Sequence, residues 1–305
     1  MDTNPCFLLF KIFTFTCAYV YNKRIMAKVL AIDLDGTLFY PKQFNRCIPT
    51  INVTFLRRWC DCGNKIVLIT SRSYEFCQKL KEEIQRPFDL ICCNSSQVYI
   101  DDVLIREKSI PRKDIQNITN KIRKKYNPLC FLATSRNYPL IMKIGKNAGK
   151  VLFLFYKFWE RCQGPYREKY LISKRKFDQE LEKGDIFKMM VFFGFGPGKK
   201  KFTKDLNKQF ITEFPSAEFS WVGKVIEVTP RGCSKAQGLE FYLEKTGIER
   251  KNLYVIGDSG NDISMFNKFY DNSFVMSHAN KSVKKYARIV VPHVSALENY
   301  LLPKK

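Results

Sequence analysis

The sequence predicts an α/β fold built around a parallel sheet, with a second domain inserted into the chain. Short apolar runs alternate with amphipathic helical segments, which is typical of a parallel sheet covered by helices on both faces. Residues 106–221 break this alternation with longer strand-like runs and basic helices. The chain has 305 residues, whereas a single hydrophobic core stops growing at roughly 250–300. Two cores are therefore expected.

Three apolar runs are the clearest strands of the predicted sheet. They are residues 29–32 (VLAI), 65–70 (KIVLIT) and 253–257 (LYVIG). Strands that are buried on both faces have this nearly continuous apolar composition, whereas half-exposed strands alternate apolar and polar residues. We therefore expect these runs to lie in the middle of the sheet.

Two intervening segments predict helices. Residues 73–84 begin with Ser73 and residues 234–247 begin with Ser234, and serine commonly caps helix N-termini. Gly247 then supplies the left-handed conformation that often ends a helix. On the first segment, the apolar side chains that share one face are Tyr74, Cys77, Leu80 and Ile84.

The two domains are predicted from these patterns. We expect residues 26–105 and 222–305 to form one discontinuous core, and residues 106–221 to form the inserted domain, with a strand at 151–159. The glycine-rich stretch 194–201 (GFGPGKKK) lacks the spacing of a phosphate-binding loop. A hairpin turn followed by exposed lysines is expected there instead.

The net charge of the chain is +23, and residues 106–221 hold 26 Lys and Arg against 11 Asp and Glu, so they contribute +15 of it. A basic surface attracts phosphates, nucleic acid or acidic lipid, and says nothing about the fold. The charge therefore narrows the class of ligand without identifying a reaction.

The N-terminal residues 1–25 are expected to lie outside the fold, which would begin at Met26. Within them, residues 6–21 are apolar except for Lys11, but they are fewer than the ~20 residues of a membrane span, and their flanks do not match a signal peptide. Contact of this run with a membrane surface or a partner is the alternative. Eleven scattered cysteines without a C-x-x-C pair favour reduced thiols in a cytoplasmic protein and argue against a zinc site.

Polar side chains follow three predicted strands at their carboxyl ends. Because these ends meet at one edge of a parallel sheet, where α/β proteins bind their ligands, the side chains are expected to converge. They are Asp33 and Asp35 after the first strand, Thr70, Ser71 and Arg72 at the end of the second, and Asp258, Asn261 and Asp262 after the third.

Such a cluster predicts phosphoryl-transfer chemistry. Up to four carboxylates in one place require a cation, and oxygen ligands of this kind suit Mg²⁺, which commonly pairs carboxylates with a phosphate. Lys235 stands at the start of a predicted helix and would add a second positive group. Carboxylates, Mg²⁺, a lysine and the Thr70 hydroxyl together form a site for a phosphoryl group.

The order of these motifs resembles the haloacid dehalogenase (HAD) superfamily. Asp33-Leu34-Asp35-Gly36-Thr37 is similar to its first motif, and the other three are matched by Thr70, by Lys235 and by Gly257-Asp258 with Asn261-Asp262. Finer similarities to the Cof-type subfamily lie at residues 94–99, 185–188 and 226–235. The resemblance implies a Rossmann-like three-layer core and an α+β cap of the C2B type.

The resemblance also implies roles for the residues that match. Asp33 would be the nucleophile that forms an aspartyl-phosphate, and Asp35 would protonate the leaving oxygen and then deprotonate water. Thr70 and Lys235 would hold the phosphoryl group. The acidic set for Mg²⁺ would be Asp33, Asp35 through its main-chain carbonyl, Asp258 and, in support, Asp262. Further phosphate or substrate contacts are expected from Leu34, Ser71, Arg72, Asn94, Asn261 and, in the cap, Lys188.

Three positions depart from the family pattern. Ser71 stands where glycine is usual, Asn94-Ser95 replaces Asn-Gly, and Met276-Ser277-His278-Ala279 replaces Met-Gly-Asn-Ala. These changes affect loops and substrate fit, and none removes a group from the expected mechanism. His278 is expected to be a loop residue without a chemical role. For Lys188, a contact with substrate and an exposed position on a strand are equally weighted alternatives.

The function that the sequence favours is a Mg²⁺-dependent phosphatase of small phosphorylated metabolites, such as sugar or cofactor phosphates. A phosphomutase of the phosphomannomutase type uses the same motifs and is the nearest alternative. A basic protein that binds nucleic acid or a membrane surface is the alternative from another class, although no nucleic-acid motif supports it. The sequence does not indicate an oligomeric state.

Overall fold

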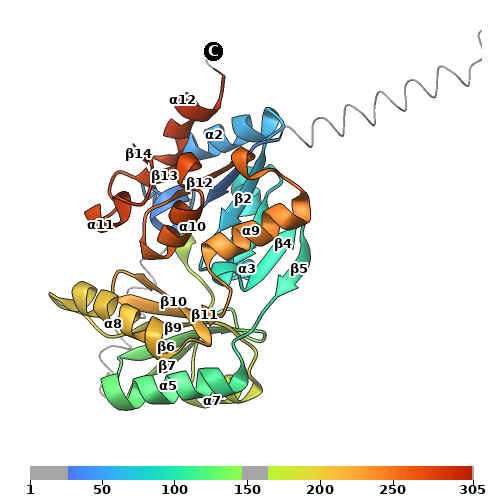
Figure 1. Ribbon diagram of the computed structural model, residues 1–305. Helices are drawn as coiled ribbons and strands as arrows, with labels where there is room; N and C mark the ends of the chain where they lie inside the picture. The colour runs from blue at the N-terminus through green and yellow to red at the C-terminus, as the bar shows by residue number, and fades with distance from the viewer. Residues whose placement is uncertain (1–26, 146–163, 304–305) are drawn as a thin grey trace, which may run out of the picture.

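The chain folds into two parts, each with its own sheet and helices (Figure 1). The structure is a computed structural model and describes residues 27–145 and 164–303. The predicted extension at residues 1–25, its apolar run 6–21 and the predicted strand at 151–159 lie outside the described residues. Within the described part, no helix is both long enough and apolar enough to cross a membrane.

The larger sheet has eight strands in the order β14-β13-β12-β1-β2-β3-β4-β5. The six strands from β14 to β3 are parallel, and β4 and β5 continue the sheet antiparallel. The predicted central strands are confirmed as β1, β2 and β12. The strand bounds are β1 Val29–Ile32, β2 Lys65–Ile69, β3 Asp89–Cys92, β4 Gln97–Ile100, β5 Val103–Glu107, β12 Leu253–Gly257, β13 Ser273–Met276 and β14 Ile289–Val291.

Helices cover both faces of this sheet because its central strands are apolar on both sides. In β1, Leu30 and Ile32 pack into one hydrophobic cluster, whereas Val29 and Ala31 pack into another. The first cluster is closed by α2 (Thr50–Asp61), α3 (Tyr74–Gln78), α4 (Leu80–Ile84) and α12 (Glu298–Leu301). The second is closed by α9 (Lys235–Thr246), α10 (Ile263–Lys268) and α11 (Lys281–Lys284). The three-layer α/β core predicted from the sequence is confirmed.

The smaller sheet has six strands in the order β10-β11-β9-β6-β7-β8, antiparallel except for the pair β7 and β8. We call this part the cap. Its strands are β6 Cys130–Ser135, β7 Ile141–Ile144, β8 Leu171–Ile172, β9 Ile186–Phe192, β10 Ala217–Val222 and β11 Val225–Pro230, and its helices are α5 Arg112–Tyr126, α7 Lys174–Lys183 and α8 Lys199–Glu213. In Figure 1, α5 and α7 lie on the side of the cap farthest from the core.

The predicted limits of the cap, residues 106 and 221, are wrong. Strand β5 continues the core sheet to Glu107, and β11 lies between β9 and β10 in the cap sheet. The chain therefore returns to the core after Pro230. The sequence misplaced this limit because β11 is followed directly by a core motif, and a strand's partners are not visible in its own composition.

The local signals in the sequence were mostly accurate. Ser73 and Ser234 cap α3 and α9 as predicted, and Gly247 ends α9 with a φ of 68°. The predicted helix at residues 73–84 is divided into α3 and α4 at Lys79. The hairpin predicted at residues 194–201 is wrong, because Gly198 begins helix α8 and the lysines that follow form its first turn.

Seven of the connections in the described residues contain short helical segments. They are η1 Leu34–Leu38, η2 Cys93–Ser95, η3 Gly164–Tyr166, η4 Arg250–Asn252, η5 Gly260–Asp262, η6 Tyr270–Asn272 and η7 Val294–Leu297. Three of them, η1, η2 and η5, follow the carboxyl ends of β1, β3 and β12, so they form the edge of the core sheet that faces the cap.

Candidate active site

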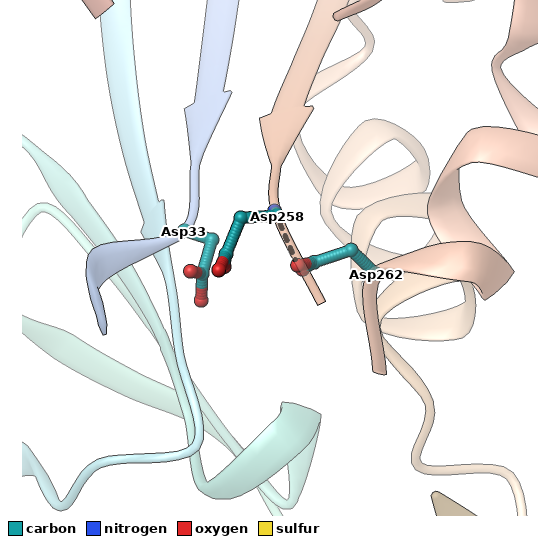
Figure 2. A group of neighbouring side chains, drawn as sticks. All are labelled: Asp33, Asp258 and Asp262. Atoms are coloured by element: carbon teal, nitrogen blue, oxygen red, sulfur yellow. Dashed lines mark hydrogen bonds between the residues drawn. The ribbon is translucent and has the colours of Figure 1, made fainter. Parts of the chain in front are cut away.

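Two adjacent parallel strands, β1 and β12, bring together two parts of the chain that are far apart in sequence. Ile32 of β1 is in register with Ile256 of β12, and the main-chain N–H of Asp33 donates to the Ile256 carbonyl at 3.1 Å. Figure 2 shows the carboxylates of Asp33 and Asp258 side by side and that of Asp262 close by. Carboxylate oxygens of these three residues lie within 4.8 Å of one another. The predicted convergence of the first and third motifs is thus present.

The close approach of these carboxylates depends on Gly36. Its φ of 84° is a left-handed conformation that favours glycine, and it belongs to the turn η1 that follows Asp33. A Cβ atom at this position would lie 2.7 Å from Cγ of Asp258. The glycine of the first motif therefore lets the β1 loop lie directly against Asp258.

Lys235 is the positive group at the centre of the cluster. It begins helix α9, is fully buried, and donates to Oδ1 of Asp33 and Oδ1 of Asp262 at 2.6 Å each. Burial acts to lower the pKa of Lys235, but the carboxylates of Asp262 and Asp33 raise it above its usual value. The lysine is therefore charged at neutral pH, and it neutralises one of the three carboxylates.

The remaining negative charge is not balanced. Burial raises the pKa of Asp33 to about 7, with Lys235 opposing and Asp262 adding to the shift. Burial and the nearby Asp33 carboxylate also raise the pKa of Asp258 to about 8. Shifts in this direction show that the ionised carboxylates lack a sufficient counter-charge. The donor set is made of hard oxygen ligands, so these residues fit a divalent cation of the Mg²⁺ class.

Asp262 has a supporting position in this cluster. Its Oδ1 accepts from Lys235, and its Oδ2 accepts from the main-chain N–H groups of Asp258 and Ser259 at 2.9 Å each. The dashed line in Figure 2 marks the first of these main-chain bonds. With both oxygens occupied, Asp262 holds the loop after β12 and orients Lys235, whereas Asp33 and Asp258 are the carboxylates better placed to accept a metal.

Asp35 and Arg72 form a bidentate ion pair at the edge of the cluster. Nε and Nη2 of Arg72 each lie 2.6 Å from a carboxylate oxygen of Asp35, whose side chain is 51% exposed. Burial acts to raise the pKa of Asp35, but Arg72 and then Lys188 and Lys42 lower it. Arg72 was predicted to contact phosphate, and the structure instead places its guanidinium on Asp35.

Other predicted residues lie around the same edge. Thr70 is buried, and its hydroxyl accepts from the Arg72 main chain at 3.1 Å. Lys188 of cap strand β9 is buried and donates to the Ser71 carbonyl, so the cap does deliver this amine to the core. The exposed strand lysine considered as an alternative is wrong. The Leu34 side chain packs in the hydrophobic core, which leaves only its main chain for a phosphate contact.

Asn94 and Asn261 are joined by Glu227, a residue for which the sequence analysis predicts no role. Oε2 of Glu227, a buried residue of cap strand β11, accepts from Nδ2 of Asn94 at 2.7 Å and from Nδ2 of Asn261 at 3.2 Å. Because Glu227 lies in the cap and both amides lie in the core, these bonds link the two parts at the site. The sequence signal that could have identified Glu227 is its position as an acidic residue between apolar residues of a strand.

His278, which the sequence analysis expects to be a loop residue without a chemical role, lies next to Asp258. Its Nε2 lies 3.8 Å from Oδ2 of Asp258, and its ring lies against Tyr40 with centroids 4.1 Å apart. Burial lowers the pKa of His278, so the imidazole is neutral at pH 7. The histidine therefore lies beside the acidic cluster as a neutral neighbour of Asp258, not as its counter-ion.

The arrangement can support phosphoryl transfer. A carboxylate, Asp33, lies between an ammonium group and a second carboxylate, and a further acid, Asp35, lies at the exposed edge. A cation on Asp33 and Asp258 together with Lys235 would place positive charge where a transferred phosphoryl group develops negative charge. No histidine or cysteine in the described residues takes part in this group of metal-ligand type.

Comparisons with known proteins agree with this geometry. The sequence profile of the haloacid dehalogenase-like hydrolases matches residues 30–296. The chain is 26% identical to the 5-amino-6-(5-phospho-D-ribitylamino)uracil phosphatase YcsE of Bacillus subtilis over 88% of this chain and 91% of that one. It is 23% identical to the pyridoxal phosphate phosphatase YbhA of Escherichia coli over 87% and 93%.

A solved structure has the same fold. The sugar phosphatase BT4131, of HAD subclass IIB, superposes with a TM-score of 0.70 at 19% sequence identity, over 90% of this chain and 98% of that one. Because the superposition covers nine tenths of the chain, the fold of both the core and the cap is shared with that sugar phosphatase.

Proposed function

The chain belongs to the haloacid dehalogenase-like hydrolase family, as a phosphatase of its Cof type, and from that premise we propose that it hydrolyses small phosphorylated metabolites through an aspartyl-phosphate with Mg²⁺ as cofactor. The observation that carries the proposal is the buried group of Asp33, Asp258 and Asp262 around Lys235. It supplies a nucleophilic carboxylate, a cation site and a fixed positive charge within one edge of the sheet.

The proposed mechanism divides one difficult displacement into two steps. Oδ2 of Asp33, the oxygen not bound by Lys235, attacks phosphorus while the bond to the leaving oxygen breaks. Asp35 gives that oxygen a proton, for which it must first leave its ion pair with Arg72 and become protonated, because the paired carboxylate is ionised. Asp35 then takes a proton from water, which attacks the aspartyl-phosphate and releases phosphate. Lys235 and the Thr70 hydroxyl hold the phosphoryl oxygens, and Lys188 reaches the same region from the cap.

We propose Asp33, Asp258 and the Asp35 main chain as the residues that hold Mg²⁺, which would neutralise charge on the phosphoryl group. Binding should depend on pH, because Asp33 and Asp258 have pKa values of about 7 and 8 without the metal. Their raised values mean that metal-free protein loses stability as pH rises through this range, and Mg²⁺ should restore it. The difference in Tm between Mg²⁺ and EDTA is expected to grow from pH 6 to pH 8.

Differential scanning fluorimetry at several pH values measures this difference. Asp258→Asn is expected to abolish most of the Mg²⁺ effect, whereas Asp271→Asn, at an exposed position, should leave it unchanged. An equal Mg²⁺ effect at pH 6 and pH 8 would contradict the assignment of these carboxylates as ligands.

The substrate class is proposed from the relatives and from the basic cap. The two bacterial relatives are named for a ribitylaminouracil phosphate and for pyridoxal phosphate, both small phosphorylated metabolites. A panel of sugar, nucleotide and cofactor phosphates should yield free inorganic phosphate with Mg²⁺ present. Product analysis with a hexose phosphate separates this outcome from a phosphomutase, which would give an isomerised sugar phosphate and no free phosphate.

A further inference from the structure

A cavity lies between the cap and the core, beside the candidate active site. Its volume is about 390 Å³, within the range of small-molecule sites in proteins. The cap contributes residues of β10, β11 and α8 to its lining, and the core contributes residues of η2, α9, η5 and α10. Lys235, Asn94 and Asn261 are among them, whereas the three carboxylates of the acidic cluster are not. The cavity is therefore a neighbour of the acidic cluster and distinct from it.

A close contact between the two parts fixes one wall of this cavity. Trp221 of β10 lies against Gly260 of η5, where a Cβ atom would lie 2.4 Å from the Trp221 carbonyl oxygen and 2.8 Å from Cε2 of its ring. Nζ of Lys204, from cap helix α8, lies over the same ring at 5.4 Å from its centroid. The glycine therefore lets the cap strand lie directly on the core, and the indole is held in place at the cavity.

The described residues that line the cavity offer no free cation. Only two of them are charged, Lys235 and Glu218. The ammonium group of Lys235 is bound by Asp33 and Asp262, and Oε1 of Glu218 accepts from the main-chain N–H of Gly232 at 3.1 Å. Phosphate and carboxylate sites need charged donors. In a chain with a net charge of +23, this cavity is thus unsuited to a second anion.

Neutral hydroxyl and amide side chains form most of the polar lining. They are Asn207, Ser220, Ser234, Gln237, Ser264 and Asn267, and Trp221, Phe219 and Ile263 supply apolar surface beside them. Asn207 is 5% exposed, and its Oδ1 has no hydrogen-bond partner among the described residues. A buried polar atom without a partner is unfavourable and uncommon. Because the terminal torsion of asparagine is broad, a small rotation lets this oxygen accept from a hydroxyl group in the cavity.

We propose that this cavity is a binding site for a small uncharged molecule with several hydroxyl groups, a sugar or a polyol. Hydroxyl groups donate and accept, as the hydroxyl and amide groups of the lining do, and the carbon atoms between them pack on its apolar residues. Such a ligand contacts the cap and the core at once, so it stabilises the arrangement in which the two parts touch. The site lies outside the acidic cluster, and its occupation does not depend on the proposed function.

Calorimetric titration of the metal-free protein with two matched ligands tests this inference. Sorbitol and gluconate share the same polyol chain, but gluconate ends in a carboxylate. Sorbitol is expected to bind in the millimolar range, about tenfold or more tightly than gluconate, because the cavity has no partner for a buried charge. Attraction by net charge alone would give the opposite order. Titration is preferable to thermal melting, since polyols at high concentration stabilise proteins in general.

Variants of the lining locate the ligand. Asn207→Leu is expected to weaken sorbitol binding about tenfold, and its Tm without ligand should equal or exceed that of the unmutated protein, because the unpaired oxygen is removed. Asn267→Ala, at an exposed position of the core wall, should also weaken binding and decides the question if the first variant does not fold. Gln209→Leu, at an exposed position of the same helix as Asn207, is the control and should bind sorbitol normally.

Asp33→Asn should also bind sorbitol normally, because Asp33 does not line the cavity. Loss of binding in this variant would place the ligand in the acidic cluster and overturn the inference. The absence of sorbitol binding, equal or tighter binding of gluconate, or unchanged binding in both lining variants would overturn it as well. None of these outcomes bears on hydrolysis of phosphate esters, so the proposed function stands or fails separately.

Discussion

Asp33→Asn is expected to lower the turnover of p-nitrophenyl phosphate with Mg²⁺ by at least about 10⁴-fold, because an amide oxygen cannot form the aspartyl-phosphate. The protein should remain folded. Asparagine has nearly the same shape, and the change removes one of three carboxylates from a cluster with a single ammonium group. Without metal, the Tm of the variant should equal or exceed that of the unmutated protein.

The covalent intermediate gives a second readout. Unmutated protein that is quenched in acid during turnover should carry a phosphoryl group that hydroxylamine removes, and Asp33→Asn should carry none. Asp61→Asn changes an exposed aspartate paired with Arg86 on the surface and should keep full turnover. Retained turnover in Asp33→Asn would exclude this residue as the nucleophile.

The position of the candidate active site could be predicted because its residues directly follow strand ends. Buried parallel strands have a distinctive composition, and whatever follows them must lie at one edge of the sheet. Asp33 and Asp258 are 225 positions apart, yet two apolar runs of four and five residues were enough to place them together. The helix caps at Ser73, Ser234 and Gly247 could also be predicted from the sequence, because capping depends only on neighbouring residues.

The contacts between cap and core could not be predicted in the same way. Arg72 follows a strand end, where a phosphate ligand is expected. Its guanidinium instead binds Asp35 and the carbonyl of Tyr166, a residue 94 positions later in the chain. Glu227 stands in a strand that the sequence assigned to the core, and its partners are two amides from opposite ends of the core. Such contacts depend on how two domains pack, and no local periodicity encodes that packing.

The distribution of charge has a consequence for the site. Most of the excess positive charge lies in residues 106–221, whereas the edge of the core presents buried carboxylates. A small phosphate ester is attracted by the cap over about a Debye length, and then needs a cation to approach the acidic cluster. The same reasoning makes Lys235 a group on which both stability and catalysis depend.

Lys235→Met is expected to destabilise the metal-free protein by about 3–5 kcal/mol at pH 8, because it leaves the buried carboxylates of Asp33 and Asp262 without their ammonium partner. The cost should shrink as pH falls below the raised pKa of about 7 at Asp33, since a protonated carboxyl needs no counter-charge. Urea unfolding at pH 5.5 and pH 8 measures both values.

The same substitution should reduce turnover by about 10²–10³-fold, as expected when one fixed donor to a developing negative charge is lost. Mg²⁺ should recover part of the stability, because it supplies positive charge to Asp33, but little of the rate, because it cannot replace the ammonium group beside Asp262. Lys245→Met, at the exposed end of the same helix, controls for the loss of a lysine from α9. A destabilisation that is equal at both pH values would show that Lys235 acts through its packing, and not through the charge of the carboxylates around it.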